Sequence, residues 1–268
     1  MRSASPDLKE QEYLRNPFLL TLGERREGYK YYELLVVVPN VVGVLSTITG
    51  KLAEAKVNIL TGMHTRIGEK GVWVSFIEVP DAVSIEKTIK EISSLNVVLE
   101  LKYQRMDRAE RFDKFLFPLS VFDRRMIVLT DYMFYSLKTA LIDVLKSGGE
   151  TILYMQGQSL GEVVINFLKE RFKEETASIE DALHLVAEAF RAFGWGIITF
   201  QGLGPKTKEG SIIVRECIEC RESSKVKCHF IRGMLVGVLR SIFQDETINV
   251  TEIKCRSTGD PYCEYQLV

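Results

Sequence analysis

The sequence has no long apolar run and no excess of charge of either sign. No apolar stretch among its 268 residues approaches the about 20 that span a bilayer. The polar start, Met1 to Asn16, lacks the apolar segment of a signal peptide. The 35 basic and 36 acidic residues leave a net charge of -1, which argues against a nucleic-acid or anionic-membrane surface. We therefore expect a cytoplasmic protein that binds neither nucleic acid nor membranes directly.

Histidine is scarce, and cysteine is confined to one end of the chain. The three histidines, His64, His184 and His229, suggest no Ser-His-Asp or Cys-His constellation, so no hydrolytic site is predicted. All five cysteines fall between Cys217 and Cys263. Such clustering in a cytoplasmic chain indicates metal or redox chemistry rather than a disulfide framework.

The length and the pattern along the chain predict two domains. Hydrophobic residues make up 46% of the sequence and charged residues 26%, which is ordinary for a globular protein. We expect an N-terminal extension over residues 1–28, a first domain over 29–105, a charged linker over 106–114 and a second domain over 115–268.

The first domain alternates strand and helix patterns. Buried strands and amphipathic helices are expected, in chain order, at 32–38 (strand), 44–56 (helix), 57–66 (strand), 72–79 (strand), 85–92 (helix) and 97–103 (strand). Residues 68–71 read as a hairpin turn. The order β-α-β-β-α-β predicts a ferredoxin-like fold.

Two segments of this domain, Pro39 to Leu45 and Leu52 to Ile59, resemble the first loop, first helix and second strand of the ACT domain. The resemblance implies a regulatory module that binds an amino acid at a subunit interface. The ligand-binding candidates that it implies are Asn40, Val42, Gly43, Val44 and Asn58. Gly43 would let backbone amides approach an anionic group at the helix N-terminus. The family often has an acidic residue where Asn40 stands. The alternative is a unit that serves only dimerisation or packing.

The second domain is predicted to be α+β, with helices over an antiparallel sheet. Helices are expected at 135–146, 150–172, after Ser178, and at 228–243. Strands are expected at 195–201, 211–219, 248–255 and 263–268. Asp181, three residues after Ser178, indicates a weak capping box.

Four residues near the C-terminus have the chemistry of a closed zinc site: Cys228, Glu252, Cys255 and Cys263. Structural zinc takes four protein ligands in a tetrahedron and favours thiolates. Cys228 is expected at a helix N-terminus, which favours the thiolate form. Residues three apart on a regular strand face opposite ways, so Glu252 and Cys255 can share an ion only if the strand bulges or ends between them. We predict such a break. Candidate cations around the site are Lys227, His229, Lys254 and Arg256.

The segments Cys228 to Gly233, Val250 to Cys255 and Gly259 to Tyr265 resemble the 4-vinyl reductase domain, also called the hydrocarbon-binding domain. Tyr154 to Gly161 is similar to that family's earlier glycine pattern. The resemblance implies a fold like that of vesicle-tethering subunits, zinc on the four matched residues, a homodimer and a pocket for a small hydrophobic ligand. Our candidates for the pocket lining are Phe134, Tyr154 and Trp195.

Cys217 and Cys220 form a CxxC, a spacing that is common in zinc and redox sites. If the strand runs on to Glu219, their thiols point to opposite faces, which argues against joint ligation. We interpret both as inert buried cysteines, with a redox pair as the alternative.

Taken together, the sequence predicts a regulatory protein with two ligand-sensing domains and a structural zinc, and not an enzyme. One alternative is an enzyme acting on a hydrophobic substrate, in which zinc or the CxxC pair takes part. A catalytic zinc would keep one position open for water. The other alternative is a scaffold, which predicts a filled interior and a large partner-binding face.

Overall fold

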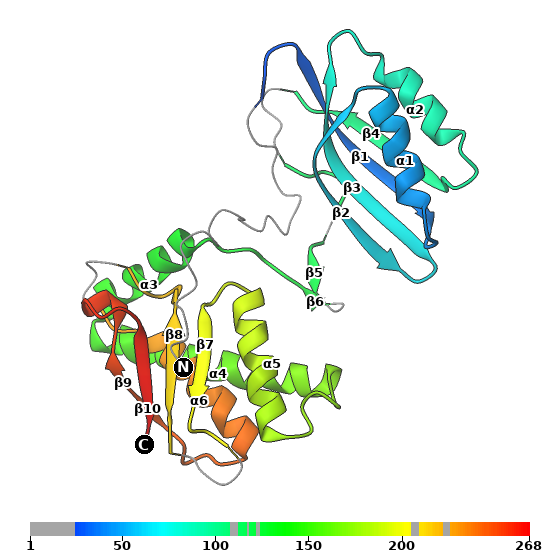
Figure 1. Cartoon of the computed structure of the whole chain (residues 1–268). Coiled ribbons are helices and arrows are strands. Elements are labelled where there is room, and N and C mark those ends of the chain that lie inside the picture. Colours follow the sequence, from blue (N-terminus) through cyan, green and yellow to red (C-terminus); the bar gives the residue numbers. More distant parts are fainter. Residues whose placement is uncertain (1–24, 108–111, 117, 122–123, 205–208, 222–225) are drawn as a thin grey trace. The chain divides into compact units, whose positions relative to one another are not determined.

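The computed structural model describes residues 25–107, 112–116, 118–121, 124–204, 209–221 and 226–268. The chain divides into two compact units, Met1–Met126 and Ile127–Val268 (Figure 1). Most of the predicted N-terminal extension and part of the predicted linker lie outside the described residues. Among the described helices, none combines the length and the apolar character that crossing a membrane requires.

The first unit is a four-stranded antiparallel sheet with two helices on one face (Figure 1). The strand order is β2-β3-β1-β4. The elements are β1 (Tyr29–Pro39), α1 (Val44–Glu54), β2 (Asn58–Ile67), β3 (Lys70–Pro80), α2 (Ile85–Ser93) and β4 (Glu100–Arg105). The predicted ferredoxin-like order is confirmed. A short strand pair, β5 (Ser120–Val121) with β6 (Arg124–Arg125), follows.

Strand β1 is apolar almost throughout because both faces of its sheet are covered. Leu34 and Val36 pack with the helices, whereas Leu35 on the other face packs with a second apolar cluster. Phe115 and Leu116 belong to that second cluster. These two residues, which the sequence analysis assigns to the second domain, therefore pack on the sheet of the first unit.

The second unit combines four helices with a second antiparallel sheet of order β7-β8-β10-β9; α5 and α6 contact the sheet, α4 packs on α6, and α3 packs on α4. The helices are α3 (Asp131–Leu145), α4 (Ser147–Arg171), α5 (Ile179–Ala192) and α6 (His229–Phe243). The strands are β7 (Ile197–Gln201), β8 (Ser211–Arg215), β9 (Val250–Lys254) and β10 (Cys263–Leu267). The predicted α+β class is confirmed. Ser178 caps α5 as predicted, since its hydroxyl oxygen accepts from the Asp181 amide at 3.1 Å.

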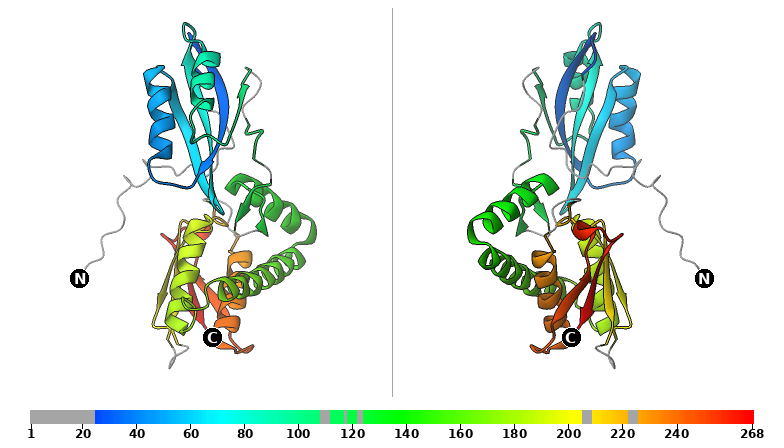
Figure 2. Two further views of the ribbon diagram at one scale, coloured as in Figure 1. Left: turned by 90° about the vertical axis from the view of Figure 1, so that its right-hand side faces the viewer. Right: turned by 90° about the vertical axis from the view of Figure 1, so that its left-hand side faces the viewer.

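Helices α4 and α6 touch backbone to backbone (Figure 2). A Cβ on Gly157 would overlap the carbonyl oxygen of Phe230, and one on Gly161 that of Met234. The contact is reciprocal, because Gly233 and Gly237 of α6 meet α4 carbonyls in the same way. Gly157 and Gly161 therefore lie inside an uninterrupted α4. Because none of the four glycines has a side chain, the two helices can approach this closely.

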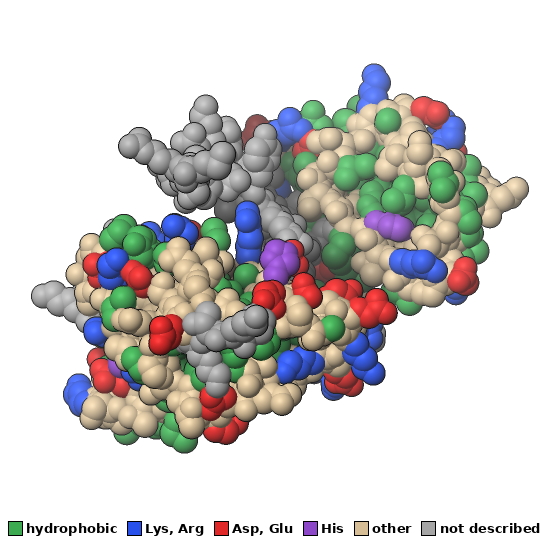
Figure 3. All heavy atoms as spheres, turned by 60° about the horizontal axis from the view of Figure 1, so that its bottom comes forward, with side chains coloured by type: hydrophobic (Ala, Val, Ile, Leu, Met, Phe, Trp, Pro, Cys, Tyr) green, Lys and Arg blue, Asp and Glu red, His purple; other side chains and the backbone are tan. Residues whose placement is uncertain are grey.

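Figure 3 shows one face of each unit. Basic and acidic side chains both occur there among apolar ones, in keeping with the nearly equal numbers of basic and acidic residues in the sequence.

Candidate metal centre

The N-terminus of α6 lies against two buried carboxylates. Cys228 is the N-cap residue, as predicted, and its amide donates to Glu252 Oε2 at 3.1 Å. The next free amides, of Phe230 and Ile231, donate to the Glu219 carboxylate at 3.2 and 2.8 Å. The free amides at the N-terminus of α6 thus hold both carboxylates next to the helix end.

The strand that carries Glu252 bulges before it reaches Cys255. Tyr265 pairs with Glu252 and Glu264 with Lys254, so Ile253 is an extra residue without a partner in the pairing. The predicted break is confirmed. After Lys254, a 3-10 turn at Arg256–Thr258 returns the chain to β10, and the Cys255 amide donates to Asp260 Oδ2 at 2.8 Å. The bulge and the turn bring Glu252, Cys255 and Cys263 to one side of the sheet.

The four predicted ligands meet in one buried cluster. The ligand atoms of Cys228, Glu252, Cys255 and Cys263 lie within 4.8 Å of one another. Cys228 Sγ is 3.7 Å from Cys255 Sγ and 3.9 Å from Cys263 Sγ. A tetrahedron with zinc–sulfur bonds of about 2.3 Å has edges of about 3.8 Å. The separations therefore suit a tetrahedral ion.

A buried oxygen of Glu252 that has no hydrogen-bond partner in the described part of the chain is a second observation that favours a cation at this site. Its side chain is only 6% exposed, and Oε1 has no hydrogen-bond partner among the described residues. Burial raises the pKa of Glu252, because the charged form has lost its water. A cation next to Oε1 would satisfy that atom and favour the carboxylate.

Cys217 and Cys220 join the same cluster, which the sequence analysis did not predict. With Cys228 and Cys263 they form a second set of donor atoms within 4.8 Å. The prediction of a strand up to Glu219 is wrong, because β8 ends at Arg215 and the chain bends at Glu216, where φ is 48°. Residues 217–220 then form a turn in which the Cys220 amide donates to the Cys217 carbonyl at 3.1 Å. The two thiols therefore do not point to opposite faces of a strand. All five thiols are free.

A buried lysine supplies positive charge next to the thiols. Lys138 of α3 is 1% exposed, and its Nζ lies 3.2 Å from Glu219 Oε1. It also donates to the carbonyls of Glu219 and Lys227 at 3.2 and 3.3 Å. Burial lowers the pKa of Lys138, but the adjacent Glu219 carboxylate opposes this effect and the pKa is raised. The buried lysine and glutamate therefore stabilise each other as an ion pair.

The cations proposed from the sequence are engaged elsewhere. Lys254 pairs with Glu264 at 2.8 Å, Arg256 with Glu216 at 3.2 Å, and His229 lies 3.7 Å from Glu150. Lys227 contributes its backbone carbonyl. Lys138 was not predicted as part of the site, although its spacing from Phe134 could have indicated it. Lys138 follows Phe134 by four residues and so lies on the buried face of α3.

Two domain families match the chain. The family profile of the ACT domain matches residues 32–97, and that of the 4-vinyl reductase domain matches residues 211–268. The chain contains an ACT domain and a 4-vinyl reductase domain. The second match includes all six donor residues of the cluster.

A curated relative matches part of the chain. An uncharacterized protein of Methanocaldococcus jannaschii is 29% identical over 121 residues, which is 44% of this chain and 64% of that protein. The chain thus spans less than two thirds of the curated relative that it matches.

Three solved structures resemble the chain at low similarity. The phenol-responsive sensory domain of the transcription activator PoxR, solved with phenol, is 16% identical, with a TM-score of 0.46, over 54% of this chain and 76% of that one. A vinyl-4-reductase family protein of Methanocaldococcus jannaschii is 21% identical, with a TM-score of 0.39, over 53% and 83%. A trafficking protein particle complex subunit 3 from Naegleria fowleri, covalently bound to palmitic acid, is 19% identical, with a TM-score of 0.38, over 50% and 90%.

Two of the three predicted pocket residues of the 4-vinyl reductase domain lie in one aromatic cluster. The ring centroids of Phe134 and Trp195 are 5.9 Å apart, edge to face. Phe230, which the sequence analysis did not single out, stacks on Trp195 at 5.7 Å and meets Phe134 at 5.2 Å. Tyr154 makes different contacts, since its hydroxyl donates to Asn249 at 3.3 Å and its ring faces Arg232.

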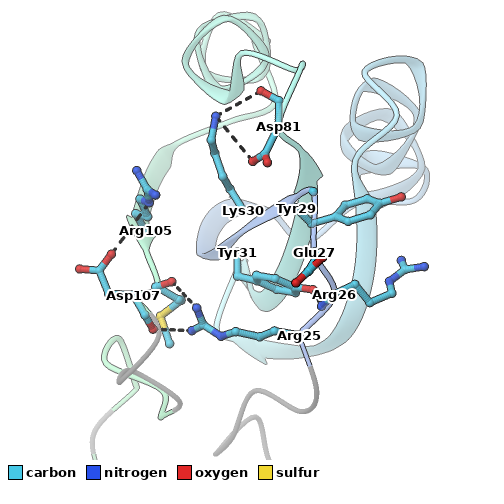
Figure 4. A pocket seen from close by; sticks show the side chains of 11 residues that line it. Arg25, Arg26, Glu27, Tyr29, Lys30, Tyr31, Asp81, Arg105 and Asp107 are labelled. Atoms are coloured by element: carbon cyan, nitrogen blue, oxygen red, sulfur yellow. Dashed lines mark hydrogen bonds and ion pairs between the residues drawn. The ribbon is translucent and has the colours of Figure 1, made fainter.

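A cavity of about 540 Å³ in the first unit, next to the start of β1, was not predicted from the sequence (Figure 4). Arg25 donates to the Met106 carbonyl at 2.9 Å, and Lys30 donates to the Asp81 carbonyl at 3.2 Å. These contacts tie the start of β1 to the ends of the neighbouring strands. The pairing of β1 with β4 brings the residues together, and no local pattern indicates it.

The predicted ligand residues of the ACT domain fall at two ends of its sheet. Gly43 has φ 87° and is the N-cap of α1, a left-handed conformation that favours glycine. Asn40 and Val42 are exposed beside it, and Val44 is buried in the core. Asn58 starts β2 and donates to Glu78 Oε1 at 3.0 Å, near the start of β1. A single chain therefore does not bring Asn58 to the Gly43 loop.

Proposed function

We propose that this protein is a regulator that senses small molecules through its ACT and 4-vinyl reductase domains, and that a structural zinc ion holds the second of these domains together. The observation that carries the proposal is the buried set of Cys228, Glu252, Cys255 and Cys263, in which four donors surround one point. Three thiolates and a carboxylate form a zinc-type donor set.

A regulatory function fits this donor set better than an enzymatic one. A catalytic zinc keeps one position for water or substrate, usually with three protein ligands. Here four donors are buried, and one of them, Glu252, is also bonded to the Cys228 amide. The ion would therefore brace the N-terminus of α6 against β9 and β10. The enzyme alternative requires Glu252 to leave the ion.

For the 4-vinyl reductase domain we propose a small hydrophobic ligand at the cluster of Phe134, Trp195 and Phe230. Within α3 only Phe134 and Lys138 are buried, and Lys138 is tied to Glu219 whereas Phe134 packs against other apolar side chains. Displacement of Phe134 would open an apolar, aromatic site of the kind that binds planar ligands. Ligand binding would then change the position of α3.

For the ACT domain we propose an amino acid whose carboxylate lies at the N-terminus of α1. The first turn of α1 contains no acidic residue, and its N-cap Gly43 makes no side-chain cap bond. The free amides and the helix dipole favour an anion there. A second copy of the chain would supply Asn58, because one chain keeps the two apart. This arrangement requires the homodimer that the family resemblance implies.

The two tryptophans allow each domain to be tested in the intact chain. Trp73 lies in the core of the ACT domain and Trp195 in the aromatic cluster of the 4-vinyl reductase domain. In the Trp73→Phe variant, the fluorescence emission of Trp195 should change and saturate as phenols or other small apolar compounds are added. Amino acids should not change it. In Trp195→Phe, Trp73 should report amino acids instead.

Native mass spectrometry of the purified protein measures the bound metal and the oligomeric state. We expect a dimer with one zinc per chain. The proposal fails if neither tryptophan responds across both panels, or if the chain carries no metal and takes up none on addition of zinc.

A further inference from the structure

The metal cluster contains more donors than one tetrahedral ion can use. Two overlapping donor sets share Cys228 and Cys263; one adds Glu252 and Cys255, and the other adds Cys217 and Cys220. Cys220 also lies close to Cys255, so with Cys228, Cys255 and Cys263 as three ligands, either Glu252 or Cys220 can be the fourth. Cys220 Sγ lies 3.0 Å from Cys228 Sγ, 3.2 Å from Cys263 Sγ and 3.9 Å from Cys255 Sγ. The separation from Cys255 matches the edge of a zinc–thiolate tetrahedron, about 3.8 Å, and the separations from Cys228 and Cys263 are shorter than that edge.

The position of Cys220 is held by the fold and does not depend on the thiols themselves. Its neighbour Glu219 is fully buried, accepts the amides of Phe230 and Ile231, and pairs with Lys138. The turn that carries Cys220 is therefore anchored to the same helix N-terminus that presents Cys228.

We infer that Cys220 and Glu252 are alternative fourth ligands of one ion, which the three thiolates of Cys228, Cys255 and Cys263 hold throughout. The inference rests on the proposed metal site. When Cys220 binds, its thiol proton passes to the departing Glu252 carboxylate, and the reverse step returns it. Both states place four anionic ligands around a divalent ion, so the charge of the site does not change. The buried Lys138–Glu219 pair beside the site is the same in either state.

The two alternative ligands differ in how they are reached. Cys220 is the one cysteine of the five that is not buried, and with Cys217, Arg221 and Arg256 it lines a cavity of about 680 Å³. Glu252 is buried. A thiol-reactive compound that enters the cavity would thus take Cys220 from the ion, and Glu252 would replace it. The ion would stay bound after modification of a ligand.

The test uses the zinc-loaded full chain, limited N-ethylmaleimide and a chromophoric zinc chelator. In the unsubstituted protein we expect one adduct, on Cys220, with the zinc retained. In Glu252→Gln the same adduct should release the zinc, since no replacement ligand remains. Zinc loss from the unsubstituted protein as soon as Cys220 is modified would overturn the inference.

Metal affinities of the variants give a second readout. Cys220→Ser and Glu252→Gln should each lower the zinc affinity by less than about tenfold, and the double variant by about 100-fold or more. Cys217 belongs to the second donor set, so Cys217→Ser is also measured in the Glu252→Gln background. If Cys220 is the exchanging ligand, that double variant should bind zinc like Glu252→Gln alone. A Cys220→Ser variant that binds zinc like the unsubstituted chain, or a Cys220→Ser, Glu252→Gln variant no weaker than Glu252→Gln, would contradict the inference.

Cobalt substitution counts the thiolates directly. The sulfur-to-cobalt charge-transfer band of Glu252→Gln should be stronger than that of Cys220→Ser by about one third, as expected for four thiolates against three. Equal bands would mean that Cys220 is not a ligand. Two ions per chain in native mass spectrometry would also overturn a single shared ion. A chain that binds no metal at all would instead remove the proposed metal site itself.

Discussion

The two domains of this chain are stabilised in different ways. The ACT domain buries apolar side chains on both faces of its sheet, and the described part of it contains no cysteine. The first unit buries two carboxyls, those of Glu33 and Glu78, whereas the 4-vinyl reductase domain gathers Lys138, Glu219, Glu252 and four buried thiols around the start of α6. A core with that much charge needs a counter-ion and close helix contacts. Conditions that remove metal should therefore affect one domain and spare the other.

Loss of both shared thiolates, Cys228 and Cys263, should give the largest difference in stability between the two domains. Both residues belong to both donor sets, so the double variant Cys228→Ser, Cys263→Ser should remove the ion and destabilise the 4-vinyl reductase domain by several kcal/mol, about 5 or more. The ACT domain should unfold as before. Denaturant unfolding followed by Trp195 in a Trp73→Phe background, and by Trp73 in a Trp195→Phe background, measures the two domains in turn. An equal loss of stability in both domains would contradict the conclusion that only the 4-vinyl reductase domain depends on a metal.

Lys138→Met should be the next most damaging change. It leaves the Glu219 carboxylate buried without its cation, which typically costs about 3 to 5 kcal/mol. The loss should appear in the Trp195 transition alone. Lys51→Met, which removes an exposed lysine paired with Glu54 in the ACT domain, serves as the control and should leave both transitions in place. A Lys138→Met variant as stable as the control would show that the buried pair is dispensable.

Gly157→Ala tests the contact between α4 and α6. The added methyl group would overlap the Phe230 carbonyl, and the helices must part at a cost of about 1 to 3 kcal/mol. Gly148→Ala, near the start of the same helix, is the matched control. The nearest atom to a Cβ there is 3.8 Å away, so the unfolding midpoint should stay or rise slightly. Similar midpoints for the two variants would argue against a backbone contact.

The smallest effect is expected from Glu33, a buried carboxyl of the ACT domain. Burial and the neighbouring Asp113 raise the pKa of Glu33 to about 7 from 4.5. The folded domain then binds more protons than the unfolded one, so this contribution to stability is complete below pH 4.5 and is lost as the pH rises through 7. The loss is on the order of 2 kcal/mol. Glu33→Gln should flatten the pH dependence of the Trp73 transition in this range. An unchanged slope would show that Glu33 has no raised pKa.

Local patterns were enough to predict most of the fold. The continuous apolar run of β1 reflects a strand that is covered on both faces, and the helical spacing of α1 and α2 reflects one face of each helix against the core. These elements are predicted within a few residues of their ends. The bulge at Ile253 could be predicted because two ligands three residues apart on a strand require one.

The remaining features of the site depend on contacts that a local pattern does not record. The turn at Cys217 to Cys220 follows from a positive φ at Glu216, a conformation that a glutamate side chain does not indicate. Lys138 meets Glu219 across 81 residues of sequence, and only the folded chain pairs them. The sequence alone therefore indicates an inert cysteine for Cys220, next to a strand expected to end at Glu219.

The reciprocal glycine contact between α4 and α6 limits how this chain can diverge. Gly157 and Gly161 each face a carbonyl of α6, and Gly233 and Gly237 each face one of α4. A larger residue at any one of them would part the helices and move Cys228, the N-cap of α6, away from its fellow thiols. The four positions should therefore be inherited together. In descendants that have lost the thiols, the pressure to keep them should weaken first at Gly157 and Gly233, nearest to the start of α6.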